Sequence, residues 1–194
     1  KMFGLPAFDW LYQSVKERQE SLSCDRRNKK NRILITSQAP YTKDHLEFLE
    51  CVIKLALRYP AVDVLVKPHP SSGGDIEAAL ATKHGLKNIS VVHGDFQDFL
   101  PIIDCLVTEY STTGLEAIVY GVKVVIYQKS EISAVPFQQL DGVLMVKSFG
   151  QLARAVEAVL SDKSDFLINK DVSKIIHNYI PPADRISQLI FDSY

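Results

Sequence analysis

A histidine held between two prolines is the first group in this sequence that could do chemistry. His69 lies in the segment KPHP, directly after the apolar run VDVLV. Proline fixes its own φ and biases the preceding residue toward extended backbone, so this imidazole is carried on a stiff loop. We predict that His69 is a catalytic residue that donates to a phosphate oxygen, with Lys67 adding positive charge beside it. A histidine that only caps the turn after a strand is the alternative.

A run of hydroxyl side chains is the second such feature. Ser111, Thr112 and Thr113 precede Gly114, between an apolar strand pattern and a helical pattern. The first N–H groups of a helix have no partner within the helix, and the helix dipole favours negative charge there. We therefore expect these three residues to bind a phosphate group. Ordinary N-capping by Ser111 or Thr112 is the alternative, and the two roles are compatible.

Further polar residues receive weaker predictions. Glu116 is expected to accept hydrogen bonds from a ribose diol, or else to be a first-turn acidic residue that the helix dipole favours. His93 and Gln38 follow predicted strands and are expected to contact the ribose or the base. An N-cap role accounts for Asp95. Three histidines on helical patterns are expected at the surface: His45, His84 and His177.

The scaffold that must position these residues is predicted from periodicity. Short β-branched runs alternate with longer helical patterns, which is typical of βαβ units and a parallel sheet. Strands are expected at Arg32–Thr36, Val62–Val66, Asn88–Val92, Cys105–Thr108, Lys123–Tyr127 and Gly142–Val146. This is an α/β class, a Rossmann-like doubly wound parallel sheet of about six strands. Ligands bind such sheets beyond the carboxyl ends of the strands, near the point where strand order reverses.

Helical periodicity completes the expected fold. Helices are predicted at Lys43–Arg58, Asp75–His84, Phe96–Ile103, Leu115–Tyr120 and Gly150–Leu160, with further helical patterns at 3–21, 172–179 and 182–191. Thr42 is expected to cap the first of these helices. Its apolar stripe is expected at Leu46, Leu49, Ile53 and Leu57. We expect a leading helix and connector over residues 1–31 and one domain over residues 32–194.

Composition narrows the functional class. The 194 residues are 46% hydrophobic and 23% charged with a formal net charge of -1, so a nucleic-acid partner is not expected. Three cysteines, Cys24, Cys51 and Cys105, have no metal-like spacing and are expected to be reduced thiols in a cytoplasmic protein. The sequence has no GxGxxG, Walker, GxSxG, CxxC or HExxH motif, and no metal site is expected.

KPHP and the later segment TEYSTTGLEAIVYGVKVVIY resemble the C-terminal, donor-binding half of GT-B glycosyltransferases. The resemblance spans Arg32 to Gln128. It is closest to capsule polysaccharide and Kdo transferases, bacterial polysialyltransferases and CDP-glycerol glycerophosphotransferases. In those families an HP motif and a serine/threonine motif hold the donor phosphate. The resemblance implies these roles for His69, Ser111 and Thr112, with Thr113 beside them, and a ribose contact for Glu116.

The resemblance also implies a reaction. A glycosyl or glycerol-phosphate group would move from a CMP-, CDP- or UDP-linked donor during surface polysaccharide synthesis, without a cofactor. The acceptor half and its acidic motif have no counterpart in this sequence, so we expect an N-terminal acceptor domain elsewhere in a longer parent protein, and little activity from this piece alone. Peripheral association of the parent with a membrane is left open.

Two alternatives remain at this point. Non-hydrolysing UDP-GlcNAc 2-epimerases have a similar layout, although their phosphate loop usually carries Ser-Gly-Gly, from which Ser111, Thr112 and Thr113 depart. A module that binds nucleotide or a regulatory partner without catalysis is the other alternative.

Overall fold

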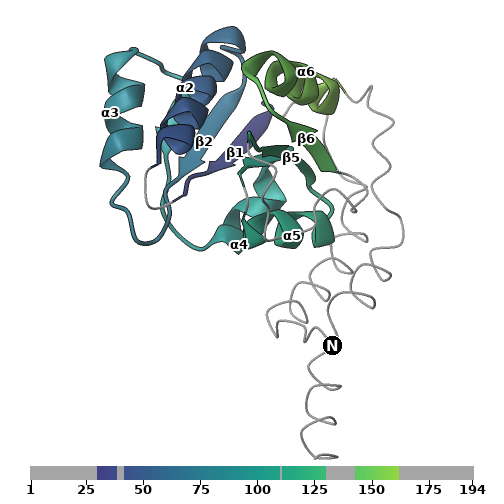
Figure 1. Ribbon diagram of the computed structural model, residues 1–194. Coiled ribbons are helices and arrows are strands. Elements are labelled where there is room, and N and C mark those ends of the chain that lie inside the picture. The colour runs from purple at the N-terminus through teal and green to yellow at the C-terminus, as the bar shows by residue number, and fades with distance from the viewer. Residues whose placement is uncertain (1–29, 39–41, 110, 130–142, 162–194) are drawn as a thin grey trace, which may run out of the picture.

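The computed structural model describes residues 30–38, 42–109, 111–129 and 143–161 (Figure 1). The helices expected at 3–21, 172–179 and 182–191 lie outside these residues, as do Cys24 and His177. The domain boundary expected at residue 31 stays a prediction.

Six parallel strands form one sheet. They are β1 (Arg32–Thr36), β2 (Asp63–Lys67), β3 (Ile89–Val91), β4 (Cys105–Thr108), β5 (Lys123–Tyr127) and β6 (Val143–Val146). Their order is β3-β2-β1-β4-β5-β6, so strand order reverses between β1 and β4. The expected doubly wound parallel sheet is confirmed, and each expected strand matches an observed one to within one residue at either end.

Strand β1 lies at the centre because it pairs with β2 on one side and with β4 on the other. Alternate side chains of a strand point to opposite faces, and both faces of this sheet are covered. Ile33 and Ile35 accordingly join one hydrophobic cluster, and Leu34 joins the other. This two-sided burial explains why β1 has a continuous apolar sequence.

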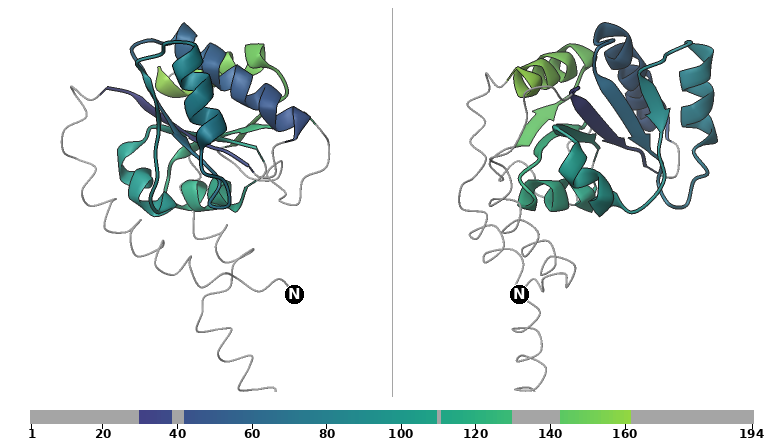
Figure 2. Two further views of the ribbon diagram at one scale, coloured as in Figure 1. Left: turned by 90° about the vertical axis from the view of Figure 1, so that its left-hand side faces the viewer. Right: turned by 180° about the vertical axis from the view of Figure 1, so that it is seen from behind.

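The helices form a layer on each face of the sheet (Figure 2). They are α2 (Lys43–Arg58), α3 (Asp75–Lys83), α4 (Phe96–Phe99), α5 (Thr112–Val119) and α6 (Phe149–Leu160). Residues of α2 and α6 pack in one hydrophobic cluster, and residues of α4 and α5 pack in the other. No helix within the described ranges is both long and apolar enough to cross a bilayer.

Two helix boundaries differ from the expected ones by more than one residue. The helix predicted from Phe96 to Ile103 ends at Phe99 and continues as a 3₁₀ turn, Leu100–Ile102. Proline has no N–H to donate to the preceding turn, and Pro101 lies at this transition. Helix α5 begins at Thr112, three residues earlier than predicted, because the Ser111 side chain caps it by accepting from the Thr113 N–H.

The buried stripe of α2 also differs from the predicted one. Leu46 and Leu57 are 43% and 54% exposed, whereas Phe48 and Val52 are buried together with the expected Leu49 and Ile53. The prediction that His45 lies at the surface is wrong, because the residue is only 1% exposed. His45 precedes Phe48 by three positions and therefore shares its helical face.

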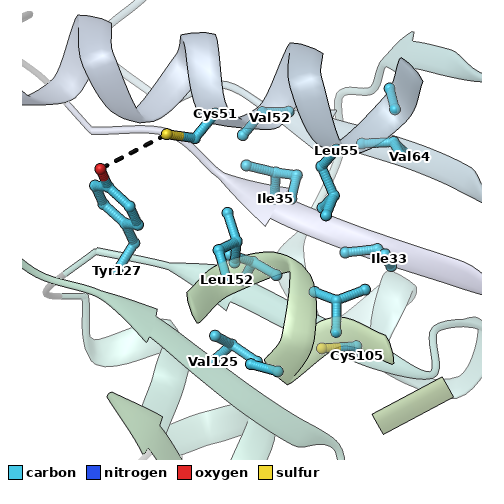
Figure 3. Close-up of a cluster of buried hydrophobic side chains, with 14 of the residues drawn as sticks. Ile33, Ile35, Cys51, Val52, Leu55, Val64, Cys105, Val125, Tyr127 and Leu152 are labelled. Atoms are coloured by element: carbon cyan, nitrogen blue, oxygen red, sulfur yellow. Dashed lines mark hydrogen bonds between the residues drawn. The ribbon is translucent and has the colours of Figure 1, made fainter. Parts of the chain in front are cut away.

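Two cysteines lie in the core, as the sequence predicted (Figure 3). Cys51 donates a weak hydrogen bond from Sγ to the Tyr127 hydroxyl over 3.6 Å. Burial, aided by the charge of Asp104, raises the pKa of Cys105 to about 12. Its thiol therefore stays protonated at neutral pH and is a poor nucleophile.

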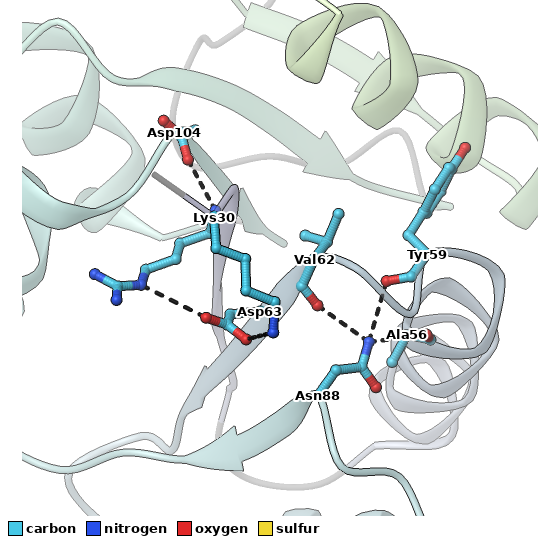
Figure 4. Close-up of polar contacts among 8 residues, drawn as sticks. Lys30, Ala56, Tyr59, Val62, Asp63, Asn88 and Asp104 are labelled. Atoms are coloured by element: carbon cyan, nitrogen blue, oxygen red, sulfur yellow. Dashed lines mark hydrogen bonds and ion pairs between the residues drawn. The ribbon is translucent and has the colours of Figure 1, made fainter. Parts of the chain in front are cut away.

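Polar side chains at the amino edge of the sheet form hydrogen bonds with backbone groups and an ion pair with a lysine (Figure 4). The Asn88 amide nitrogen donates to the carbonyls of Ala56, Tyr59 and Val62 at 3.0 to 3.1 Å. The first two of these carbonyls close the C-terminus of α2, where helix carbonyls lack partners. Asp104 accepts from a backbone N–H of β1 at 2.8 Å, and Asp63 pairs with Lys30.

Candidate functional site

A pocket of about 390 Å³ opens at the carboxyl edge of the sheet. Its walls come from the end of β1 (Thr36 and Ser37), the loop after β2 (67–70 and Ser72), the loop after β3 (93–96) and the start of α5 (Ser111 and Thr113). The pocket therefore spans the point between β1 and β4 where strand order reverses, which is the usual ligand position in a doubly wound sheet.

Five predicted site residues come together around this pocket. They are Lys67, His69, His93, Ser111 and Thr113, which are distant in sequence but follow neighbouring strands. The other three predicted residues do not line the pocket: Thr112 is exposed, and Gln38 and Glu116 are half-buried. The structure thus groups the two short motifs in one cavity, while the role of each residue stays a prediction.

The loop after β2 holds the imidazole of His69 with its own backbone. The N–H of Ser71 donates to His69 Nδ1 at 3.2 Å, and the Ser71 hydroxyl lies 2.8 Å from the same nitrogen. A nitrogen that accepts these bonds carries no hydrogen, so the neutral ring carries its hydrogen on Nε2. His69 is thereby prepared to act as an Nε2–H donor without first gaining a proton.

One glycine lets this loop pass closely over helix α3. Gly74 has φ of 84°, in the left-handed region that side chains disfavour. A Cβ at this position would lie 2.6 Å from Cγ of Pro68. Glycine at position 74 therefore allows Pro68 and the start of α3 to pack directly against each other.

A ladder of hydroxyl groups connects β1 to the start of α5. Thr113 Oγ1 donates to Ser111 Oγ at 2.9 Å, and Thr36 Oγ1 lies 3.4 Å from Thr113 Oγ1. Thr36 also donates to Thr108 Oγ1 at 2.6 Å. N-capping by Ser111 is confirmed, since its Oγ accepts from the Thr113 N–H at 3.3 Å. The Gly114 N–H donates to the Ser111 carbonyl at 3.0 Å, so the Thr112 N–H is the group of this first turn that is left for an anion.

The pocket contains both signs of charge. Among the described residues that line it, Lys67 is the cation and Asp95 has the carboxylate, with His69 and His93 as further polar side chains. Asp95 occupies the N-cap position of α4, but its side chain makes no capping hydrogen bond. The expected N-cap position of Asp95 is confirmed, but without the capping hydrogen bond, and the residue also lines the pocket.

Glu116 lies one turn into α5 and bonds to a side chain of α4. Gln97 Nε2 donates to Glu116 Oε2 at 2.8 Å. Partial burial raises the pKa of Glu116 above its ordinary value of 4.5, and the bond from Gln97 only partly opposes this. A ribose contact would require Glu116 to exchange this partner.

Several polar residues near the pocket were missed in the sequence. Thr36 and Thr108 each end an apolar strand, and the two are register partners in the sheet. Threonine at the ends of two such strands was the sequence signal for this pair. Ser37 bonds to His45 and to Glu77, and His45 bonds to Glu109. The helical spacing of His45 from Phe48 was the signal for its burial. Among the described residues, no cluster of three or more His, Cys, Asp or Glu side chains could hold a metal ion.

Solved structures of other proteins share the fold of this chain. No family model matches the sequence, and no curated protein matches it either. The C-terminal domain of the glycosyl transferase group 1 family protein LpcC from Francisella tularensis is similar, with TM-score 0.56 and 18% identity, over 86% of this chain and 91% of that one. The C-terminal CMP-Kdo binding domain of WaaA from Acinetobacter baumannii has TM-score 0.54 and 14% identity, over 86% and 95%.

Epimerases are similar as well. UDP-GlcNAc 2-epimerase from Neisseria meningitidis, solved with UDP-GlcNAc bound, has TM-score 0.58 and 15% identity over 86% of this chain. This chain spans 48% of that enzyme and 39% of a putative epimerase from Listeria monocytogenes. The chain therefore has the fold of the C-terminal half of GT-B glycosyltransferases, as the sequence resemblance implied, and the epimerases share that fold.

Proposed function

We propose that this chain is the donor-binding half of a GT-B transferase that moves a glycosyl or glycerol-phosphate group from a nucleotide-activated donor in surface polysaccharide synthesis. The observation that carries the proposal is the meeting of His69 with Ser111 and Thr113 in one pocket at the strand-order reversal. The fold shared with glycosyltransferase C-terminal domains supports it.

The residues of the pocket suit a departing phosphate. When the bond between the transferred group and the donor phosphate breaks, its electron pair goes to a phosphate oxygen. His69 would donate to that oxygen from Nε2, and the Thr112 N–H of α5 with the hydroxyls of Ser111 and Thr113 would bind its neighbours. Lys67 adds positive charge. We assign the catalytic base for the acceptor to a second domain.

The nucleoside would lie toward the loop after β3. His93 and Asp95 line that side of the pocket, and the Asp95 carboxylate is not used by the helix it precedes. A carboxylate there can accept hydrogen bonds from a ribose diol. Gln38 and Glu116 stay proposed ribose or base contacts whose side chains would have to turn toward the ligand. The proposed reaction takes place in the cytoplasm and uses neither metal nor cofactor.

A sugar-nucleotide epimerase is the second candidate. The structural likeness to an epimerase solved with UDP-GlcNAc favours it. The two candidates share the nucleotide site and differ in whether an acceptor is needed. Conversion of UDP-GlcNAc by the full-length parent without an acceptor would select the epimerase.

Calorimetric titration with CMP, CDP and UDP tests the proposal on the 194-residue chain and on its parent. We expect saturable binding of at least one nucleotide, weakened in His69→Ala. If the parent binds none of the three, the proposal is wrong. If the parent binds nucleotide and transfers sugar at an unchanged rate in His69→Ala, only a binding or regulatory role for this site survives.

A further inference from the structure

Four buried polar residues connect four elements beneath the pocket. Glu77 of α3, Ser37 after β1, His45 of α2 and Glu109 after β4 are each at most 5% exposed. We call this set the buried bridge. Ser37 Oγ donates to Glu77 Oε1, His45 Nε2 lies 3.1 Å from Ser37 Oγ, and His45 Nδ1 bonds to Glu109 Oε2. The bridge thus contains two buried carboxylates joined through one imidazole and one hydroxyl.

Each residue of the bridge has a partner within it. The Ser37 hydroxyl donates to Glu77 and lies beside Nε2 of His45. The other ring nitrogen of His45, Nδ1, bonds to Glu109. These bonds compensate polar groups that would be costly to bury alone.

Both ends of the bridge reach the walls of the pocket. Ser37 lines the pocket itself, and its backbone N–H donates to the carbonyl of Lys67 at 3.0 Å, at the base of the His69 loop. Glu77 lies in the first turn of α3, which follows that loop directly. Glu109 is two residues before Ser111, the N-cap of α5. The bridge therefore joins the His69 loop to the Ser111 turn through a path that does not cross the cavity.

A buried ion pair by itself is weak evidence for stability, because hydrophobic residues of similar volume often serve as well. Fixed geometry is the better-supported use of such a group, since a fully bonded network has one arrangement. We propose that His45 is a positioning residue of this pocket: through the buried bridge it fixes the spacing between the His69 loop and the Ser111 turn. For its effect on ligand binding, this inference rests on the proposed nucleotide-binding function.

His45→Asn is the direct test. An asparagine amide can still donate toward Glu109, but Ser37 loses its contact with the ring. Leu55→Val is the matched control, because Leu55 is as buried as His45 on the same helix and lies outside the bridge. We expect His45→Asn to weaken CMP binding about 10-fold, the value of one hydrogen bond to a charged group, and Leu55→Val to leave it unchanged. Equal weakening in both variants, or in neither, overturns the proposal.

A second pair of variants keeps the test decisive if His45→Asn does not fold. Glu77→Leu removes the acceptor of the Ser37 hydroxyl, whereas Glu77→Gln keeps a carbonyl oxygen there. We expect Glu77→Leu to weaken CMP binding about 10-fold and Glu77→Gln to restore most of it. Failure of the glutamine variant to restore binding overturns the positioning role.

Ligand-free NMR separates failure of this inference from failure of the proposed function. We expect amide shifts of Ser71, Ser72, Ser111 and Thr113 to move in His45→Asn and to stay in place in Leu55→Val. If the wild-type chain binds no nucleotide, the proposed function fails, and the amide shifts still decide the positioning role. Unmoved shifts at the two turns contradict the bridge.

Discussion

The two edges of the sheet are both polar, but they use their polar groups differently. At the amino edge, Asn88 donates to three backbone carbonyls, and Asp104 accepts from a backbone N–H of β1 (Figure 4). At the carboxyl edge, Ser111 and Thr113 bond mainly to other hydroxyls and border a pocket. Side chains at the amino edge form hydrogen bonds with the protein backbone, whereas those at the carboxyl edge border a pocket and can bond to a ligand.

This difference separates stability from binding. Substitutions at the amino edge should lower the free energy of unfolding and leave nucleotide affinity unchanged in the folded protein. Substitutions at the carboxyl edge should weaken nucleotide binding and leave the free energy of unfolding nearly unchanged. Each prediction below compares one change with a matched control, and a change that affects both properties equally would remove the distinction.

Asn88→Ala should have the largest effect. It removes the Asn88 donor from the carbonyls of Ala56, Tyr59 and Val62, of which that of Tyr59 keeps the Val62 N–H, so we expect the free energy of unfolding to fall by about 3 kcal/mol. Denaturant unfolding measures this, with Asn31→Ala as the control at an exposed amino-edge position. CMP affinity of the folded variant should equal that of the wild type; a loss there would show that the two edges are coupled.

Ser111→Asp should separate capping from phosphate binding. Aspartate caps helices about as well as serine, so the unfolding free energy should change by no more than about 0.5 kcal/mol. The added carboxylate faces the site of the proposed phosphate and should weaken CMP binding more than about 100-fold. Ser148→Asp is the control, since Ser148 caps α6 by accepting from the Gln151 N–H and does not line the pocket. Equal affinity in the two variants would remove Ser111 from the site.

His69→Ala should weaken CMP binding about 10- to 30-fold, because it removes one donor to a charged acceptor. Its thermal unfolding should be nearly unchanged, since within the described part of the chain the ring bonds only to its own loop. His84→Ala, at an exposed position after α3, is the control. The capping alternative for His69 predicts the reverse pattern, with stability lost and affinity kept.

Glu116→Gln should have the smallest effect. Burial raises the pKa of this carboxyl above 4.5, so its charged form is disfavoured in the folded state. The associated stability is present below pH 4.5 and is lost as pH rises through the raised pKa. We expect the glutamine variant to melt about 1–2 °C above wild type at neutral pH and to show no difference at acidic pH. Glu50→Gln, at an exposed site on α2, should match wild type at both.

The sequence predicted the sheet well because its strands are buried on both faces. A strand such as β1 then has a continuous apolar run bounded by turn residues, and strand ends in a parallel sheet fall on one edge. The approximate positions of Lys67, His69 and Ser111 followed from that rule alone. Their common pocket required only that β2 and β4 flank β1.

What the sequence could not give depends on side-chain partners across the fold. Glu116 could equally face a ribose or α4, and only the position of Gln97 separates these. The burial of His45 was hidden because a histidine counts as polar, so the predicted stripe of α2 included the exposed Leu46 and Leu57 instead. The bridge from Glu77 to Glu109 joins residues from four elements, and no local pattern encodes such contacts.

The central claim is that the His69 loop and the Ser111 turn together bind one nucleotide phosphate. A ¹⁵N NMR titration of the chain with CMP tests it most directly. We expect the amide resonances of Ser71, Ser72, Ser111 and Thr113 to shift in a saturable way with one common dissociation constant. The amide resonances of Asn88 and Asp104 should not shift. Shifts confined to one turn, or centred on the amino edge, would contradict it.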